Sequence, residues 1–173
     1  MGAGACLLGI GLTACALATG DSVRQRGDDT AGDVTSVAGW TRIATTPSYI
    51  VIANVLPGEE MFTTEEAEAE HPLEGELIID GPSDPIGGNA RHVEAHVYDR
   101  STGLELSDVD VSLVVVNRTT GERLSVAPTL MQDVNIGPLD LHYGNNAQIP
   151  GGSNLSLTVT VENEEVTVDG LLL

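Results

Sequence analysis

The sequence contains no lysine, and its seven basic residues, all arginine, stand against 26 aspartates and glutamates, which gives a formal net charge of -19 over 173 residues. Nucleic acid and anionic membrane surfaces are bound by clusters of positive charge, so neither is an expected partner. Salt screens the repulsion within such an acidic surface. The charge therefore predicts a halophilic protein, haloarchaeal or from another saline source; the alternative is an acidic protein from a GC-rich genome in which arginine has replaced lysine.

Cysteine and aromatic residues are also scarce. Both cysteines, Cys6 and Cys15, lie within the first fifteen residues. Neither can crosslink the domain that follows, which excludes a disulfide framework and a cysteine-based zinc site there. Aromatic residues are 3% of the chain, so a hydrophobic core must consist mainly of valine, leucine and isoleucine.

The N-terminal residues have the composition of a leader followed by a linker. Residues 1–20 are apolar but short and rich in glycine and alanine, which favours an export signal over a transmembrane helix. Residues 12–15 resemble a lipobox, in which Cys15 would carry a lipid anchor. No basic residue precedes the apolar run, and a buried N-terminal helix is the alternative. Residues 21–39 are predicted to be a flexible acidic linker. We therefore expect an exported protein, at the cell surface or in a periplasm-like space, with a folded domain over 40–173.

From Trp40 onward the chain alternates between short apolar runs and turn residues, which is typical of an all-β fold. The predicted strands are Tyr49–Leu56, Glu76–Asp80, His92–Tyr98, Val109–Asn117, Arg123–Val126, Leu155–Val161 and Glu165–Leu171. About seven strands of this kind predict an immunoglobulin-like antiparallel β-sandwich. One short helix is expected, beginning at Thr63 with Glu66 in a capping box and ending at His71.

The first candidate site residues lie on one predicted strand. Between Arg91 and Tyr98 polar and apolar residues alternate with the period of a strand, so His92, Glu94 and His96 point to one face. An imidazole and carboxylate set of this kind has the composition of half of a metal site. The alternative is that the histidines lie on a solvated face.

A second group of candidates follows further along the chain. Residues 137–146 place His142 in a loop bounded by glycines, eleven residues after Met131, which is also expected in a loop. A thioether together with imidazole and carboxylate suits copper or another late transition metal. Methionine in a β-protein usually fills the core, and this alternative applies to Met61 and Met131. His71 is interpreted as a cation near a helix C-terminus.

Several segments, in order, resemble the periplasmic iron-transport accessory protein family: Leu56–Met61, His92–His96, Leu130–Gln132 and Gly137–Asn146. The resemblance covers roughly residues 49–168 and implies an exported, metal-binding, immunoglobulin-like β-sandwich associated with iron uptake. Carried over residue by residue, it implies a copper or iron ion bound by Met61, Glu94, His96, Met131 and His142, with His92 close by. The segment Gly81–Asn89 departs from the family pattern because it contains no methionine or histidine.

The sequence thus predicts an exported accessory protein that captures or relays iron or copper for membrane transport. A membrane iron permease is the expected partner, and a homodimer is expected from the family. The alternative is an immunoglobulin-like binding or structural module of the cell envelope without a tight metal site. An enzyme is not expected, because the chain has no nucleophile elbow and no glycine loop that could hold a phosphate after a strand.

Overall fold

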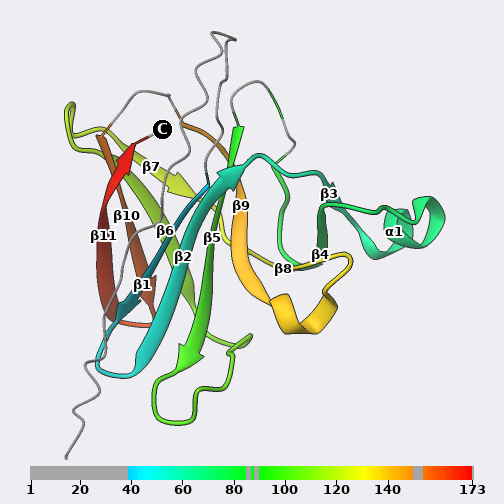
Figure 1. Ribbon diagram of the computed structural model, residues 1–173, viewed down its shortest axis with the longest axis horizontal. Helices are drawn as coiled ribbons and strands as arrows, with labels where there is room; N and C mark the ends of the chain where they lie inside the picture. The colour runs from blue at the N-terminus through cyan, green and yellow to red at the C-terminus, as the bar shows by residue number, and fades with distance from the viewer. Residues whose placement is uncertain (1–38, 85–86, 88–89, 150–153, 173) are drawn as a thin grey trace, which may run out of the picture. The chain divides into compact units, whose positions relative to one another are not determined.

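The computed structural model describes residues 39–84, 87, 90–149 and 154–172, and the structural statements below refer to these residues. The expected export signal, the possible lipid anchor at Cys15 and all but the last residue of the linker lie outside them. The described residues form eleven strands, one α-helix and one 3₁₀ helix (Figure 1). No helix among them has the length and apolar character needed to cross a membrane.

The elements, in chain order, are β1 (Trp40–Thr45), β2 (Tyr49–Pro57), β3 (Met61–Phe62), α1 (Thr64–Glu70), β4 (Glu76–Asp80), β5 (Ala90–Asp99), β6 (Val111–Asn117), β7 (Arg123–Val126), β8 (Thr129–Asp133), η1 (Gly137–Asp140), β9 (His142–Gln148), β10 (Asn154–Val161) and β11 (Glu164–Leu172).

The strands form two sheets. One has seven strands in the order β1-β2-β5-β9-β8-β4-β3, and the other has four in the order β11-β10-β6-β7. Neighbouring strands in the described part of the chain run antiparallel except β3 and β4, which are parallel. The predicted all-β antiparallel sandwich with one short helix is confirmed. Each of the seven predicted runs is a strand, with ends shifted by at most two residues.

Four strands were not predicted: β1, β3, β8 and β9. The expectation that Met131 and His142 lie in loops was wrong, because they belong to β8 and β9. Strand β9 has the sequence His-Tyr-Gly-Asn-Asn-Ala-Gln, in which glycine and asparagine have low β-propensity. It is a strand because β5 and β8 pair with it on both sides.

The short helix α1 begins and ends as predicted. Thr63 is its N-cap, and the side chains of Thr63 and Glu66 form the reciprocal hydrogen bonds of a capping box. His71 ends the helix in the left-handed conformation, with φ of 51°. The helix buries none of its residues, so it contributes little to the core.

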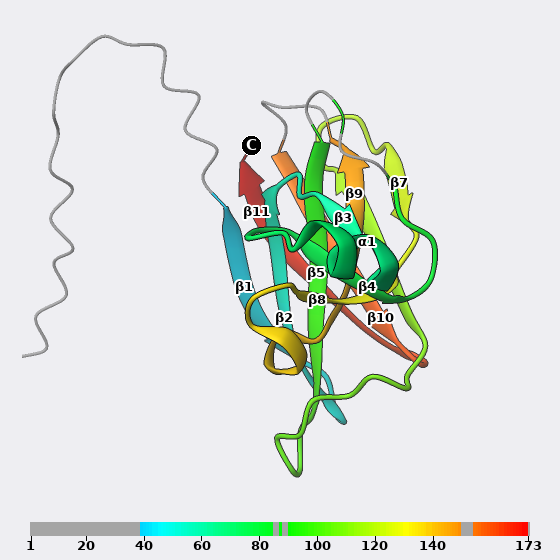
Figure 2. The same ribbon diagram turned by 90° about the vertical axis from the view of Figure 1, so that its right-hand side faces the viewer.

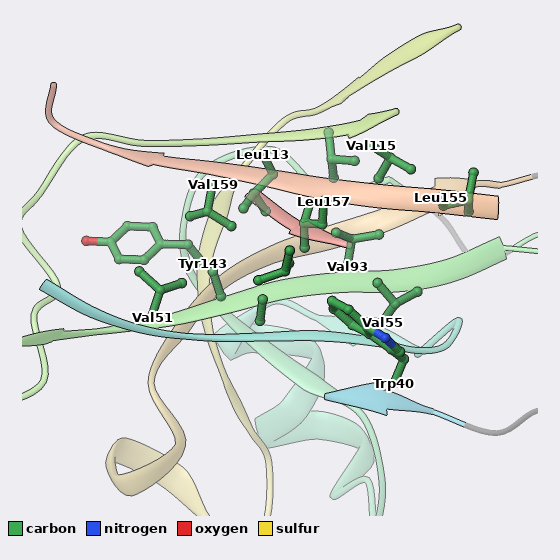
Figure 3. Close-up of a cluster of buried hydrophobic side chains, with 14 of the residues drawn as sticks. Trp40, Val51, Val55, Val93, Leu113, Val115, Tyr143, Leu155, Leu157 and Val159 are labelled. Carbon is green, nitrogen blue, oxygen red and sulfur yellow. The ribbon is translucent and has the colours of Figure 1, made fainter. Parts of the chain in front are cut away.

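The hydrophobic core lies between the two sheets (Figure 3). Val51 and Val93 of the larger sheet and Leu157 and Val159 of the smaller sheet have no exposed surface. As the composition predicted, branched aliphatic side chains fill most of this space. Burial of such side chains contributes roughly 1.5–3 kcal/mol each.

The face of the larger sheet that points away from this core is also covered. Figure 2 shows β4, β3 and α1 in front of β5, so the part of the sheet beyond β9 folds over the outer face of β5. Residues of β5 are accordingly buried on both faces. Polar side chains on that outer face are therefore shielded from water.

The core generates the first prediction. Leu157→Ala should lower the free energy of unfolding by about 2–5 kcal/mol, because the lost side chain leaves a cavity. The matched control is Leu73→Ala, because Leu73 is 81% exposed, and it should change that free energy by less than about 0.5 kcal/mol. Urea denaturation of the two variants measures both values. Equal effects would mean that Leu157 is not packed as described.

Candidate metal centre

Strand β5 places three polar side chains on the outer face of the larger sheet. His92, Glu94 and His96 alternate with Val93, Ala95 and Val97, which face the core. The three polar residues are 0%, 5% and 8% exposed. The predicted shared face is confirmed, and the alternative of a solvated face for the histidines is wrong.

Pairing between strands brings further residues to this face. Directly paired residues in antiparallel strands point to the same side of a sheet. Glu94 pairs with Gly144 of β9, and Met131 of β8 pairs with His142 of β9. Met131 also pairs with Ile78 of β4, two residues after Glu76. Side chains of β4, β5 and β9 therefore form one buried polar cluster, and Met131 of β8 lies beside His142 by strand register.

The donor atoms of this cluster surround the carboxylate of Glu94. Its Oε2 lies 3.3 Å from Nε2 of His92 and 3.4 Å from Nε2 of His142. The same His142 nitrogen lies 3.5 Å from Oε2 of Glu76. The four residues Glu76, His92, Glu94 and His142 each offer one ligand atom within 4.8 Å of the others, and we call them the metal centre.

Several of these buried atoms have no hydrogen-bond partner. They are Oε2 of Glu76, both ring nitrogens of His92 and Nε2 of His142. Buried polar groups in folded proteins are almost always hydrogen-bonded, because an unpaired one costs about 1–3 kcal/mol. Atoms that converge without partners are therefore what a bound cation would satisfy.

The spacing fits a metal ion as well. Two donors bound about 2.0–2.1 Å from a tetrahedral ion lie about 3.3–3.4 Å apart. The contacts of Glu94 with His92 and His142 have this length. They are longer than ordinary hydrogen bonds between nitrogen and oxygen, which are 2.7–3.2 Å.

Gly144 leaves the space that the centre occupies. A Cβ at this position would lie 2.9 Å from Cβ of Glu94 and 3.0 Å from Nε2 of His92. It would also lie 2.9 Å from the backbone oxygen of Val93. Only glycine lets β9 pass this close to the β5 side chains.

Neighbouring side-chain and backbone groups orient the donors. Asn54 of β2 donates a hydrogen bond to Oε1 of Glu94. Nδ1 of His142 lies 2.8 Å from the backbone oxygen of Asp140, which leaves Nε2 facing the centre. Such outer contacts fix the ring orientation of a metal-binding histidine.

A second group of donors adjoins the first. His96, Asp140 and His142 also offer ligand atoms within 4.8 Å of one another. Nε2 of His96 lies 3.4 Å from Oε1 of Glu94, and its Nδ1 lies 3.5 Å from Oε1 of Glu105. Through its two oxygens, Glu94 contacts histidines of both groups.

Burial and neighbouring charges shift the protonation of these groups. Burial raises the pKa of Glu94, but its contacts with His92 and His96 and the nearby His142 outweigh burial and hold this pKa well below its usual range. Burial lowers the pKa of His142, which leaves the imidazole neutral at pH 7. Burial raises the pKa of Glu76 to about 10, assisted by the nearby carboxyl group of Glu59.

The predicted site residues are distributed as follows. His92, Glu94, His96 and His142 lie together, and the fully buried Met131 is the cross-strand neighbour of His142. Met61 is half-buried on the short strand β3 and pairs with Glu76 at the edge of the sheet.

Three residues near the donors were not predicted: Glu76, Asp140 and Glu105. The only sequence signal for Glu76 was its position at the start of a predicted strand. Asp140 precedes His142 by two residues, and this proximity was the available signal for it. Nothing in the sequence pattern distinguishes Glu105 from other acidic residues.

Comparisons with known proteins find distant similarity to solved structures. No protein-family model matches the chain, and no curated protein does. Two solved structures of FetP from a uropathogenic strain of Escherichia coli are similar. A copper-bound variant has 17% identity and a TM-score of 0.47, with 73% of this chain and 77% of that chain covered. FetP as isolated, expressed recombinantly in the periplasm, has 17% identity and a TM-score of 0.48, with 78% and 98% covered. Identities and TM-scores this low do not support an argument about function. The function of this chain is therefore inferred from its own residues.

The close approach at Gly144 generates the second prediction. Gly144→Ala should lower the free energy of unfolding by about 1–3 kcal/mol, because the added Cβ forces Glu94 and β5 to shift. Gly87→Ala is the matched control, since among the described residues the nearest contact of a Cβ there is Nε2 of Gln148, 3.6 Å away. Thermal unfolding of the metal-free proteins compares the two. A Gly144→Ala variant as stable as the control would contradict the described packing.

Proposed function

We propose that this chain is an exported metal-binding protein that captures or relays copper or iron for transport across a membrane. The observation that carries the proposal is the buried set of unpartnered donors around Glu94. His92 and His142 each direct an unpartnered ring nitrogen toward Glu94, and the unpartnered Oε2 of Glu76 faces His142.

Electrostatics supports a bound cation. Moving carboxylates and imidazoles out of water costs several kcal/mol unless new contacts compensate for hydration. The centre contains two carboxyl groups and two imidazoles, each 5% exposed or less. A divalent cation compensates for the loss of water at all four at once.

The donor types favour copper or iron. Imidazole and carboxylate suit copper(II) and iron(II), and a thioether favours copper(I). The candidate thioethers by strand register are Met131, which pairs with His142, and Met61, which pairs with Glu76. Zinc accepts the same nitrogen and oxygen donors, so it is the appropriate competitor in a binding experiment.

The cellular setting in this proposal comes from the sequence. The apolar segment 1–20 supports export, and Cys15 is the candidate for a lipid anchor. The resemblance to iron-transport accessory proteins supports a membrane permease as recipient and a homodimer as the working form. We propose carriage of the ion rather than catalysis.

Metal titration of the full-length chain tests the proposal. Copper(II), iron(II) and zinc(II) are titrated by calorimetry in high-salt buffer, with elemental analysis of the product. We expect near-stoichiometric binding of copper or iron that His142→Ala and Glu94→Gln reduce by at least about 100-fold in affinity. His71→Asn is the control, because His71 is exposed and asparagine tolerates its left-handed backbone.

One result would contradict the proposal. Weak binding that is the same in wild type and in all three variants would leave the chain as an immunoglobulin-like module of the cell envelope without a tight metal site.

Glu76→Gln separates the role of Glu76 as a ligand from its role in packing. Glutamine keeps the shape of the carboxyl group but cannot supply an anionic oxygen. We expect metal affinity to fall by about 10–100-fold, while the melting temperature without metal changes by less than about 4 °C. Competition with a chelator and a thermal melt measure the two quantities. Unchanged affinity would remove Glu76 from the centre.

A further inference from the structure

A hollow of about 410 Å³ lies between the segment before β3, the turn before β4 and the end of β8, and its lining residue Gly75 directly precedes Glu76 of the metal centre. Four acidic residues line it, Glu59, Glu60, Glu74 and Asp133, and none of its described lining residues is basic. Clefts lined by charge of one sign concentrate oppositely charged ions and raise their rates of association. Acidic surfaces are common in proteins without metal sites. A role in metal entry therefore depends on the residues that connect this hollow to the centre.

The backbone of Glu59 is held by Asn146, a buried residue of β9, the strand that also carries His142. The side-chain oxygen of Asn146 accepts a hydrogen bond from the backbone nitrogen of Glu59 at 3.0 Å. The side-chain nitrogen of Asn146 donates one to the backbone oxygen of Glu59 at 2.7 Å. Asn146 is 3% exposed and pairs with His92 across the sheet. These two hydrogen bonds hold the backbone of Glu59 against β9.

Glu76 connects the hollow to the centre. Glu59 lines the hollow, and its carboxyl group lies close enough to that of Glu76 to help raise the pKa of Glu76. The backbone nitrogen of Glu76 donates to the oxygen of Glu60 at 2.8 Å. Its Oε2 has no hydrogen-bond partner and lies 3.5 Å from Nε2 of His142. Glu76 itself is only 3% exposed.

We propose that the acidic hollow is the entrance to the metal centre and that Glu59 passes the cation to Glu76. The inference rests on the proposed function. An entering ion first exchanges a water ligand for the carboxylate of Glu59. It then displaces the proton of the Glu76 carboxyl group, which passes to water, and binds Glu76 as Glu59 is released. Apart from this proton only coordination bonds exchange, and the ion keeps its oxidation state. Release follows the same steps in reverse.

A transfer ligand and a ligand of the centre differ in their kinetic signature. Glu59 contacts the ion only during passage, so its loss slows loading and release together and leaves the equilibrium affinity nearly unchanged. Loss of a donor such as Glu94 weakens the affinity itself. General electrostatic attraction of the cation by the hollow has a third signature: it weakens as the salt concentration rises, because salt screens exposed charges.

The experiment follows copper(II) loading of the full-length chain by stopped-flow absorbance and its release to a chelator. For Glu59→Gln we expect both rates to fall by about tenfold, with the dissociation constant within about threefold of wild type. Glu60→Gln carries the same charge change in the same hollow, and Glu68→Gln carries it on the exposed helix α1. Each protein is measured at low and high salt, and a thermal melt establishes that each is folded.

At high salt the effect of Glu60→Gln should vanish while that of Glu59→Gln remains. Rates for Glu59→Gln equal to those of the Glu68→Gln control, or an effect that salt removes, would overturn the transfer role although wild type still bound copper. A dissociation constant raised as far as in Glu94→Gln would make Glu59 a ligand of the centre and also overturn it. Absence of stoichiometric binding by wild type would instead overturn the proposed function, and this inference with it.

Discussion

The buried contacts between the Glu94 carboxylate and the surrounding imidazoles impose the main constraint on this structure. Charged and polar groups leave water only where other groups replace its hydrogen bonds. Here Asn54 satisfies one oxygen of Glu94, while the other faces His92 and His142 at distances longer than hydrogen bonds. The outer face of the larger sheet must therefore be covered, and the cover itself must bring more donors. Strand β4 does both, because it contributes Glu76.

The centre and the hydrophobic core share the same two strands. Along β5 the side chains of Val93, Ala95 and Val97 pack into the sandwich, while the alternating polar residues face the centre. Strand β9 repeats this division, with Tyr143 in the core and His142 in the centre. A rigid core holds the donors in position without any covalent crosslink in the described part of the chain. The strong negative charge of the whole chain favours cations at such a centre and at the acidic hollow.

The fold was largely predictable because most strands carry their own signal. The runs over β2, β6 and β10 are rich in valine, isoleucine and leucine between turn residues, and local sequence was sufficient for them. Strand β9 carries no such signal, since its glycine and asparagines serve the close approach to β5 and the hydrogen bonds to Glu59. Glycine and asparagine hide the strand pattern of β9, so His142 was expected in a loop.

The sequence by itself determined the alternation that puts His92, Glu94 and His96 on one face, the capped helix after Thr63, and a core without cysteine crosslinks and with few aromatic residues. These are local properties that depend on neighbours a few residues away. Only the tertiary structure decided that this face is buried and that Glu76, Asp140 and Glu105 approach the histidines. The physical reason is that strand pairing joins β4, β8, β9 and β5 across wide sequence separations, and no periodicity within one strand specifies which strand will lie beside it.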